Sequence, residues 1–190
     1  MAYEIGIWGH DFIIGLQSLI DSRVCPSNIG LDLNRYTVEL FGNSTLSLND
    51  RTTLHSIDCQ LSGKDCVLLE IGSFDLCDPS LSPEQFALNI ISYATFLRIG
   101  MNVKKVAVLQ ILRRRVEPYA GYNERVIHTN VAIQTAMACA GQNVYFWKHR
   151  GFWNCPDDIY SADGFNLSVN VGYKKYIRSI RDCIIRVLNW

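Results

Sequence analysis

Groups of polar residues and glycines follow directly after apolar runs of this sequence. They are Gly9-His10-Asp11, Gly42-Asn43-Ser44, Gly72-Ser73-Phe74-Asp75, Arg113-Arg114-Arg115 and His149-Arg150-Gly151. Because the carboxyl ends of parallel strands meet at one edge of a sheet, and ligands bind there, we expect these groups to face a common site. Their residue types then decide which chemistry that site could perform.

His10 and Asp11 place an imidazole beside a carboxylate. An aspartate can act as a nucleophile, but the ester it forms must then be hydrolysed with the help of a base. His149 follows the last apolar run and is an alternative base, although a hydrogen-bonded structural histidine is the interpretation we favour. Both histidines are kept as candidate binding residues.

Three aspartates, Asp11, Asp75 and Asp163, are expected at the same edge of the sheet. Three close carboxylates repel one another unless they are protonated or neutralised, so a hard cation is one interpretation. We favour the alternative, in which Asp75 accepts hydrogen bonds from loop amides and Asp163 caps the region before the last helix. The sequence therefore predicts no metal and no cofactor, and Asp75 remains a candidate binding residue.

The densest basic run is Arg113-Arg114-Arg115. Together with lysines and arginines of the last helix it could form a phosphate or nucleic-acid patch. The interpretation we favour is that the helix cations are solvated and that the arginines line the rim of a pocket. Arg113 and Arg115 are therefore candidate ligand contacts.

Alternating apolar segments predict the elements that position these residues. Short apolar runs predict five strands, at residues 3–8, 36–41, 67–71, 103–112 and 144–147. Helical spacing predicts four helices, at residues 12–20, 83–99, 122–140 and about 169–188. Parallel strands need crossover connections, so this order predicts a sheet covered by helices on both faces. We expect one three-layer α/β/α domain over residues 1–190.

The composition excludes several classes of protein. The 190 residues include 18 basic and 18 acidic side chains, and a net charge of zero argues against binding nucleic acid or membrane over the whole surface. No apolar run approaches the roughly 20 residues of a membrane-spanning helix, and the first residues do not resemble a signal peptide. The seven cysteines are dispersed and odd in number, which favours reduced, mostly buried thiols in an intracellular, cytoplasmic protein.

Four blocks of sequence stand in order at the expected strand ends. They are Gly9-His10-Asp11-Phe12, Leu40-Phe41-Gly42-Asn43, Ile71-Gly72-Ser73-Phe74-Asp75-Leu76-Cys77 and Asp163-Gly164-Phe165-Asn166-Leu167. Together they resemble the SGNH (GDSL-type) hydrolase family, especially the esterase-like domains of animal LINE-class retrotransposons and their relatives. The resemblance runs from about residue 4 to residue 188. It implies a flavodoxin-like α/β fold with a five-stranded parallel sheet and, in active members, ester hydrolysis.

Three positions that carry the family's chemistry hold other residues here. The resemblance implies a serine nucleophile at Asp11, an oxyanion-hole asparagine at Phe74 and a histidine base at Asn166, while Gly42 and Asp163 match. In serine hydrolases, loss of the nucleophile or the base lowers turnover by about 10⁶, and loss of one oxyanion donor lowers it by about 10² to 10³. We therefore expect no intact catalytic site, and Phe74 is large enough to fill the oxyanion region.

The leading hypothesis is a catalytically degenerate hydrolase domain that binds a ligand or partner, which weighs against an enzyme without deciding the question. That partner would be a small ester or sugar or another protein, with nucleic acid not favoured and no membrane expected. One alternative is an esterase or acetylesterase with residual or altered chemistry. Another is a retroelement-type accessory module that binds RNA or associates with itself.

Overall fold

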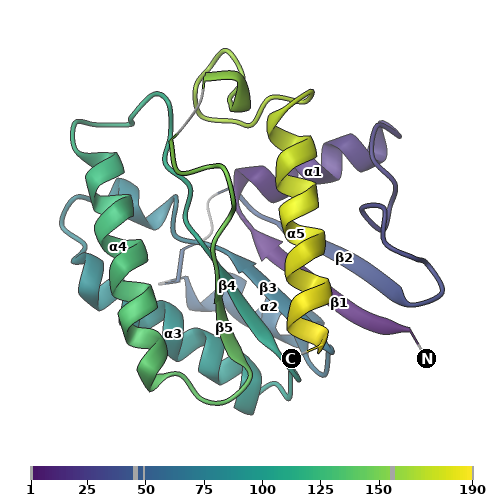
Figure 1. Ribbon diagram of the computed structural model, residues 1–190. Coiled ribbons are helices and arrows are strands. Elements are labelled where there is room, and N and C mark those ends of the chain that lie inside the picture. The colour runs from purple at the N-terminus through teal and green to yellow at the C-terminus, as the bar shows by residue number, and fades with distance from the viewer. Residues whose placement is uncertain (1, 45–46, 49, 155–156, 190) are drawn as a thin grey trace.

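Five parallel strands form one sheet in the computed structural model, which describes residues 2–44, 47–48, 50–154 and 157–189 (Figure 1). The strands are β1 (Tyr3–Gly9), β2 (Tyr36–Gly42), β3 (Cys66–Glu70), β4 (Val106–Leu109) and β5 (Val144–Trp147). Their order is β2-β1-β3-β4-β5, and every neighbouring pair is parallel. The parallel five-stranded sheet that the sequence predicts is therefore confirmed.

Helices connect the strands and cover both faces of the sheet. They are α1 (Asp11–Asp21), α2 (Arg51–Leu61), α3 (Pro83–Ile99), α4 (Tyr122–Ala136) and α5 (Gly172–Asn189), with short 3-10 helices η1 (Asp75–Cys77), η2 (Met137–Cys139) and η3 (Asp157–Ile159). Helices α1 and α5 lie on one face, and α2, α3 and α4 lie on the other (Figure 1). This confirms the three-layer α/β/α architecture.

Side chains of β3 alternate between the two hydrophobic cores, one on each face of the sheet. Cys66 and Leu68 pack with α1 and α5, whereas Val67 and Leu69 pack with the helices of the opposite face. Successive side chains of a strand point to opposite faces, so a central strand covered on both sides is apolar throughout. Glu70, the last residue of β3, is the exception, and it is also buried.

Strand β4 is shorter than the predicted strand at residues 103–112. Gln110 N still donates to the Trp147 carbonyl of β5 at 2.9 Å, but from Ile111 onward the backbone bonds to side chains of α4. The N–H of Ile111 donates to Asn130 Oδ1 at 2.9 Å, and Asn130 Nδ2 donates to the Ile111 carbonyl at 2.8 Å. Asn123 makes the same pair of hydrogen bonds with the backbone of Arg114, at 2.8 and 2.7 Å. The predicted end of this strand at residue 112 was therefore wrong.

Two further differences concern helices. Helix α4 ends at Ala136, and η2 follows it, whereas the sequence predicted one helix to residue 140. Helix α2 was not predicted, although Leu54, Ile57 and Leu61 have helical spacing and are buried against the sheet.

The six cysteines within the described ranges are free thiols, while Cys155 lies outside them. Cys25, Cys66 and Cys183 are buried, and burial raises the pKa of Cys66 to about 12. Such thiols are unreactive because the thiolate is the nucleophilic form. In the same described ranges, no helix combines the length and apolar character needed to span a membrane.

Candidate functional site

Asp11 stands at the start of α1, where the family resemblance implies a serine. Strand β1 ends at Gly9, His10 precedes the helix, and Asp11 is its first residue and half-buried. A carboxylate in the first turn of a helix is stabilised by the positive end of the helix dipole. The position therefore offers an anion but no hydroxyl.

Glycines at the ends of β1 and β2 leave room at this edge. Gly9 and Gly42 are in register, and Asn43 N donates to the Gly9 carbonyl at 3.0 Å. A Cβ at Gly9 would lie 2.6 Å from Glu70 Oε2, and a Cβ at Gly42 would lie 2.7 Å from Ile14 Cγ1. Gly42 is solvent-exposed, so its backbone is open to a ligand at the expected position.

Glu70 is a buried acid beside these residues. Its carboxylate accepts a hydrogen bond from the N–H of His10 at 2.9 Å. Burial raises the pKa of Glu70 to about 8; the Asp11 carboxylate raises it further, and the His10 N–H and Arg114 oppose the increase. Sequence reasoning did not select Glu70, although a single acid in an otherwise apolar strand was the available signal.

His10 and Ser73 form a buried pair next to Phe74. His10 Nδ1 lies 3.0 Å from Ser73 Oγ, and the two residues are 2% and 7% exposed. Phe74 is 42% exposed, and its ring meets the His10 ring edge-on with centroids 6.3 Å apart. The phenyl group has no hydrogen-bond donor, so this position cannot supply the side-chain donor that an oxyanion hole needs.

Asp163 and Asn166, where the family resemblance implies an aspartate and a histidine base, are joined by a hydrogen bond. Asn166 Nδ2 donates to Asp163 Oδ2 at 3.0 Å. Asp163 Oδ1 accepts from Ser161 Oγ at 2.6 Å and from the N–H groups of Phe165 and Asn166 at 2.7 and 2.9 Å. The Ser161 hydroxyl and these N–H groups hold the pKa of Asp163 well below its usual range. A side-chain amide cannot take up a proton at neutral pH, so Asn166 cannot act as a base.

Tyr173 of α5 is influenced by the charges of three acids at this edge. Burial raises the pKa of the Tyr173 phenol, and the negative charges of Glu70, Asp11 and Asp163 raise it further. One phenol therefore lies within electrostatic reach of all three acids. The start of α1, the end of β3 and the segment before α5 thus share one edge of the sheet.

Asp75 has a different role. It is buried, and its Oδ1 accepts hydrogen bonds from Ser47 Oγ at 2.6 Å and from Leu48 N at 3.2 Å. Among the residues that the structure describes, no three His, Cys, Asp or Glu side chains are grouped as metal ligands would be. Asp11, Asp75 and Asp163 therefore do not assemble into the alternative cation site.

The three consecutive arginines contact neighbouring aromatic rings and backbone carbonyls at the surface. Arg113 lies over the ring of Trp153 at 5.3 Å, and Arg114 lies over Tyr122 and Phe165 at 5.4 and 5.5 Å. Arg115 Nη2 donates to the carbonyls of Ser161 and Ala162 at 3.0 and 2.9 Å. The run thus joins the end of β4 to neighbouring loops, and contact of Arg113 or Arg115 with a ligand stays a prediction.

His149 is 3% exposed, and its Nδ1 lies 2.8 Å from Ser179 Oγ. Burial lowers the pKa of His149 to about 3, which makes it a weak base. Its Nε2 is buried without a hydrogen-bond partner among the described residues. This geometry fits a structural histidine rather than a replacement for the missing base.

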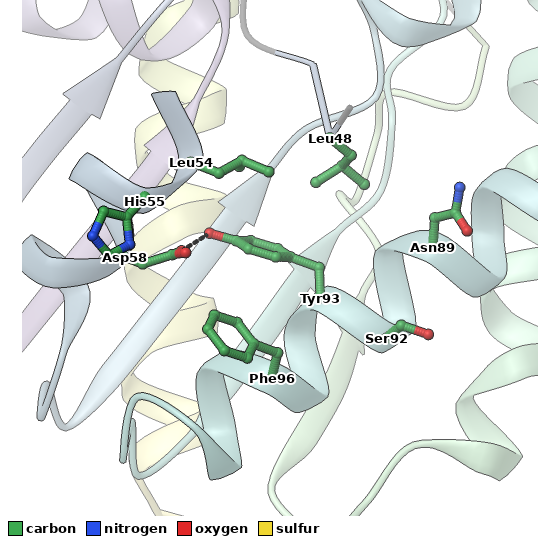
Figure 2. Close-up of a pocket in the computed structure, with 8 residues that line it drawn as sticks. All are labelled: Leu48, Leu54, His55, Asp58, Asn89, Ser92, Tyr93 and Phe96. Atoms are coloured by element: carbon green, nitrogen blue, oxygen red, sulfur yellow. Dashed lines mark hydrogen bonds between the residues drawn. The ribbon is translucent and has the colours of Figure 1, made fainter. Parts of the chain in front are cut away.

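A cavity of about 450 Å³ lies between α2 and α3 (Figure 2). Its lining consists of Leu48, Leu54, His55, Asp58, Asn89, Ser92, Tyr93 and Phe96. The buried Asp58 accepts a hydrogen bond from the Tyr93 hydroxyl at 2.5 Å, and burial and this bond raise the pKa of Tyr93. The acid therefore joins the two helices across the cavity, and sequence reasoning did not identify it.

Comparison with solved structures identifies the fold. A family 3 carbohydrate esterase from Clostridium thermocellum is 20% identical, with 100% of this chain and 98% of the esterase aligned and a TM-score of 0.67. A lipase/acylhydrolase from Enterococcus faecalis is 17% identical over 97% of this chain and 96% of its own, with a TM-score of 0.68. A GDSL-like lipase from Bacteroides thetaiotaomicron is 14% identical over 96% of this chain and 88% of its own, with a TM-score of 0.64.

No protein-family model matches the sequence, and no curated protein matches it. The α/β fold of SGNH-type hydrolases is therefore established by structural similarity over nearly the whole chain. At identities of 20% and below, the similarity shows the fold and does not extend to activity.

Proposed function

We propose that this protein is a ligand- or partner-binding domain built on an SGNH-type esterase fold, without serine-ester chemistry. The observation that carries the proposal is the hydrogen bond from Asn166 to Asp163, because it preserves the positioning of a base and removes its basicity. The carboxylate of Asp11 at the nucleophile position supports the same conclusion. The kinship with retrotransposon esterase-like domains and the intracellular location belong to this proposal and rest on the sequence.

The ligand site that we propose consists of Asp11, Gly42, Phe74 and Asn166. An anion at a helix start, an exposed glycine backbone, an exposed phenyl ring and an amide can together bind a polar molecule with an apolar face, such as an ester or a sugar. None of the four can be acylated and deacylated by the ordinary mechanism. Binding without turnover is therefore the behaviour we expect.

Hydrolysis of p-nitrophenyl acetate by the wild-type protein and by Asp11→Ala tests the proposal. We expect both proteins to give the same low rate, comparable to that of an unrelated protein at equal concentration. Turnover above that background that disappears in Asp11→Ala would show that the aspartate is a nucleophile and would reject the proposal.

The triple variant Asp11→Ser, Phe74→Asn, Asn166→His tests whether the site itself is correctly placed. If the fold still holds the catalytic geometry, this variant gains measurable esterase activity, because Asp163 and Gly42 already match the residue types that the family resemblance implies. A folded but inactive triple variant would mean that the site residues were assigned incorrectly. Far-ultraviolet circular dichroism checks that the variant is folded.

An esterase with altered chemistry is a second candidate, favoured by the 3.0 Å separation of His10 Nδ1 and Ser73 Oγ. That distance is the one expected for a base and the nucleophile it activates. Both groups are buried, so a substrate would reach them only after a local rearrangement of the protein. If Ser73→Ala abolishes turnover of p-nitrophenyl acetate that Asp11→Ala leaves intact, this candidate replaces the first.

A further inference from the structure

Strand β5 forms an open edge of the sheet between α4 and α5, at the front of the view in Figure 1. Two adjoining cavities flank it, with volumes of about 740 and 220 Å³. Both are lined by Trp147, Arg150 and Arg186, so they form one continuous depression. We call this depression and the strand beneath it the β5 surface.

The backbone of β5 can pair on its outer side. The carbonyls of Asn143 and Trp147 accept hydrogen bonds from the N–H groups of Val106 in β4 and of Gln110 just after it, each at 2.9 Å. Because alternate residues of a parallel strand direct their backbone groups to opposite sides, the N–H and C=O groups of Val144 and Phe146 point away from β4. An added strand would supply the complementary donors and acceptors.

Positive charge gathers around this edge. Five cations line the β5 surface, and Asp182 is the single carboxylate among its lining residues; the cations are Lys148, Arg150, Lys175, Arg178 and Arg186. Lys175 donates to the Gly151 carbonyl at 2.7 Å. Among the residues that the structure describes, the side chains of the other four cations have no hydrogen bond or ion pair. A chain with zero net charge therefore concentrates free cations at one sheet edge.

We propose that the β5 surface binds an extended acidic segment of a partner protein as a sixth strand. A second copy of this chain is disfavoured, because pairing two β5 edges would bring their cations together. A peptide is favoured over a nucleic acid, because Val144 and Phe146 present both N–H and C=O groups and a phosphate backbone offers mainly acceptors. This surface is separate from the strand-end site, so the inference does not depend on the proposed function.

The two faces of the sheet predict the pattern of the partner segment. Tyr145 and Trp147 face α5 and its arginines, whereas Val144 and Phe146 face α4. Side chains of an added strand alternate between the same two environments. The partner should therefore alternate acidic residues, toward α5, with apolar residues, toward α4.

A fluorescent peptide of alternating glutamate and valine, about eight residues long, is the probe, and binding is followed by fluorescence anisotropy. A glutamate–proline peptide of equal charge is the matched control, because proline lacks the N–H that strand pairing needs. We expect only the glutamate–valine peptide to bind, and we expect high salt to weaken its binding.

Charge reversal locates the site. Arg178→Glu and Arg186→Glu should each weaken peptide binding by about tenfold. Arg35→Glu is the matched control at the opposite, β2 edge, and it should leave binding unchanged. Circular dichroism confirms that each variant is folded.

Three results would overturn the inference. The first is equal binding of the glutamate–proline peptide, which would mean that only charge is recognised. The second is equal loss of binding in Arg35→Glu, which would place the interaction elsewhere. The third is failure of the glutamate–valine peptide to bind, whether or not a labelled single-stranded oligouridylate binds at the same arginines.

Discussion

Glu70 ends the central strand β3 with a carboxyl group that protein surrounds. Gly9 makes room for it, since any side chain there would collide with its oxygens. Within the part of the chain that the structure describes, the buried carboxyl group of Glu70 has one hydrogen bond, from the N–H of His10, and burial makes it more stable protonated than ionised. At neutral pH it therefore adds little negative charge beside Asp11.

Glu70 should make the stability of the protein decrease with rising pH. Its pKa is about 8 in the folded protein and near 4.5 when unfolded. Between these values the native state binds one more proton than the unfolded state, so unfolding becomes easier by about 1.4 kcal/mol per pH unit. Glu70→Gln keeps an acceptor for His10 and cannot ionise. We expect the variant to be more stable than wild type at pH 8 in urea denaturation.

The comparison at pH 4 is the control, because Glu70 is protonated there in both states and the two proteins should differ least. A wild-type protein that is as stable as Glu70→Gln at both pH values would contradict a raised pKa. It would mean that solvent or a cation reaches the carboxylate.

At the scale of elements, α1 and α5 pack closely on the same face of the sheet. Gly15 of α1 faces the phenol of Tyr173, and a Cβ at Gly15 would lie 1.7 Å from that hydroxyl oxygen. This contact explains why a glycine stands in a helix, where it is normally less stable than alanine by about 1 kcal/mol. The same tyrosine is the phenol close to Asp11 and Asp163. The packing of α1 against α5 therefore also fixes the position of the Tyr173 side chain beside the candidate site.

Gly15→Ala should destabilise the protein by about 1–3 kcal/mol through overpacking, despite the better helix propensity of alanine. Tyr173→Phe removes the hydroxyl that collides. The double variant should therefore recover part of the loss, and thermal denaturation of the four proteins of this cycle measures the coupling. Additive effects of the two substitutions would show that the helices separate instead of clashing.

Helix α4 completes the hydrogen bonding of β4 beyond its last paired residue. Asn130→Ala should cost about 2–4 kcal/mol, because the buried N–H and C=O of Ile111 lose their partners. Asn123→Ala is the control, since the Arg114 backbone that it leaves unpaired is only part-buried and water can replace the side chain. A larger loss for Asn123→Ala in chemical denaturation would contradict this order.

These side-chain bridges mark where sequence reasoning reaches its limit. Apolar periodicity predicted all five strands and four of the helices, because burial on one or both faces leaves a direct pattern. It extended β4 too far, since Ile111 and Leu112 are buried like strand residues although asparagines satisfy the backbone. It missed α2, whose apolar residues are few and whose surface is polar.

The candidate site was predictable to the same extent. The order of the strands predicted that the segments of Asp11 and Gly42 lie at one edge of the sheet, whereas Asp163 was selected from the family resemblance alone. What local spacing could not reveal was the environment of each side chain. His149 and Asp75 are buried and hydrogen-bonded to residues far apart in sequence. Burial by distant segments likewise raises the pKa of Glu70.

For the whole molecule, a buried base and a buried acid together determine how the free energy of unfolding depends on pH. His149 lies under α5 and stays neutral, and Glu70 lies at the end of β3 and stays protonated. Burial disfavours the charged form of each side chain. On unfolding, His149 takes up a proton and Glu70 releases one. The two groups therefore have opposite effects on how stability changes with pH.

The pH dependence of global stability should therefore have a plateau. His149 has a pKa of about 3 when folded and near 6.5 when unfolded, so the unfolded state binds the extra proton between these values and stability rises with pH. Glu70 lowers stability from about pH 4.5 to about pH 8. The two effects cancel between pH 4.5 and 6.5, and stability falls on either side by about 1.4 kcal/mol per pH unit.

Urea denaturation from pH 3.5 to 8 measures the profile. In Glu70→Gln the fall above pH 6.5 should disappear and the fall below pH 4.5 should remain. A single maximum near pH 8 in the wild-type protein would show that these two groups do not govern its stability.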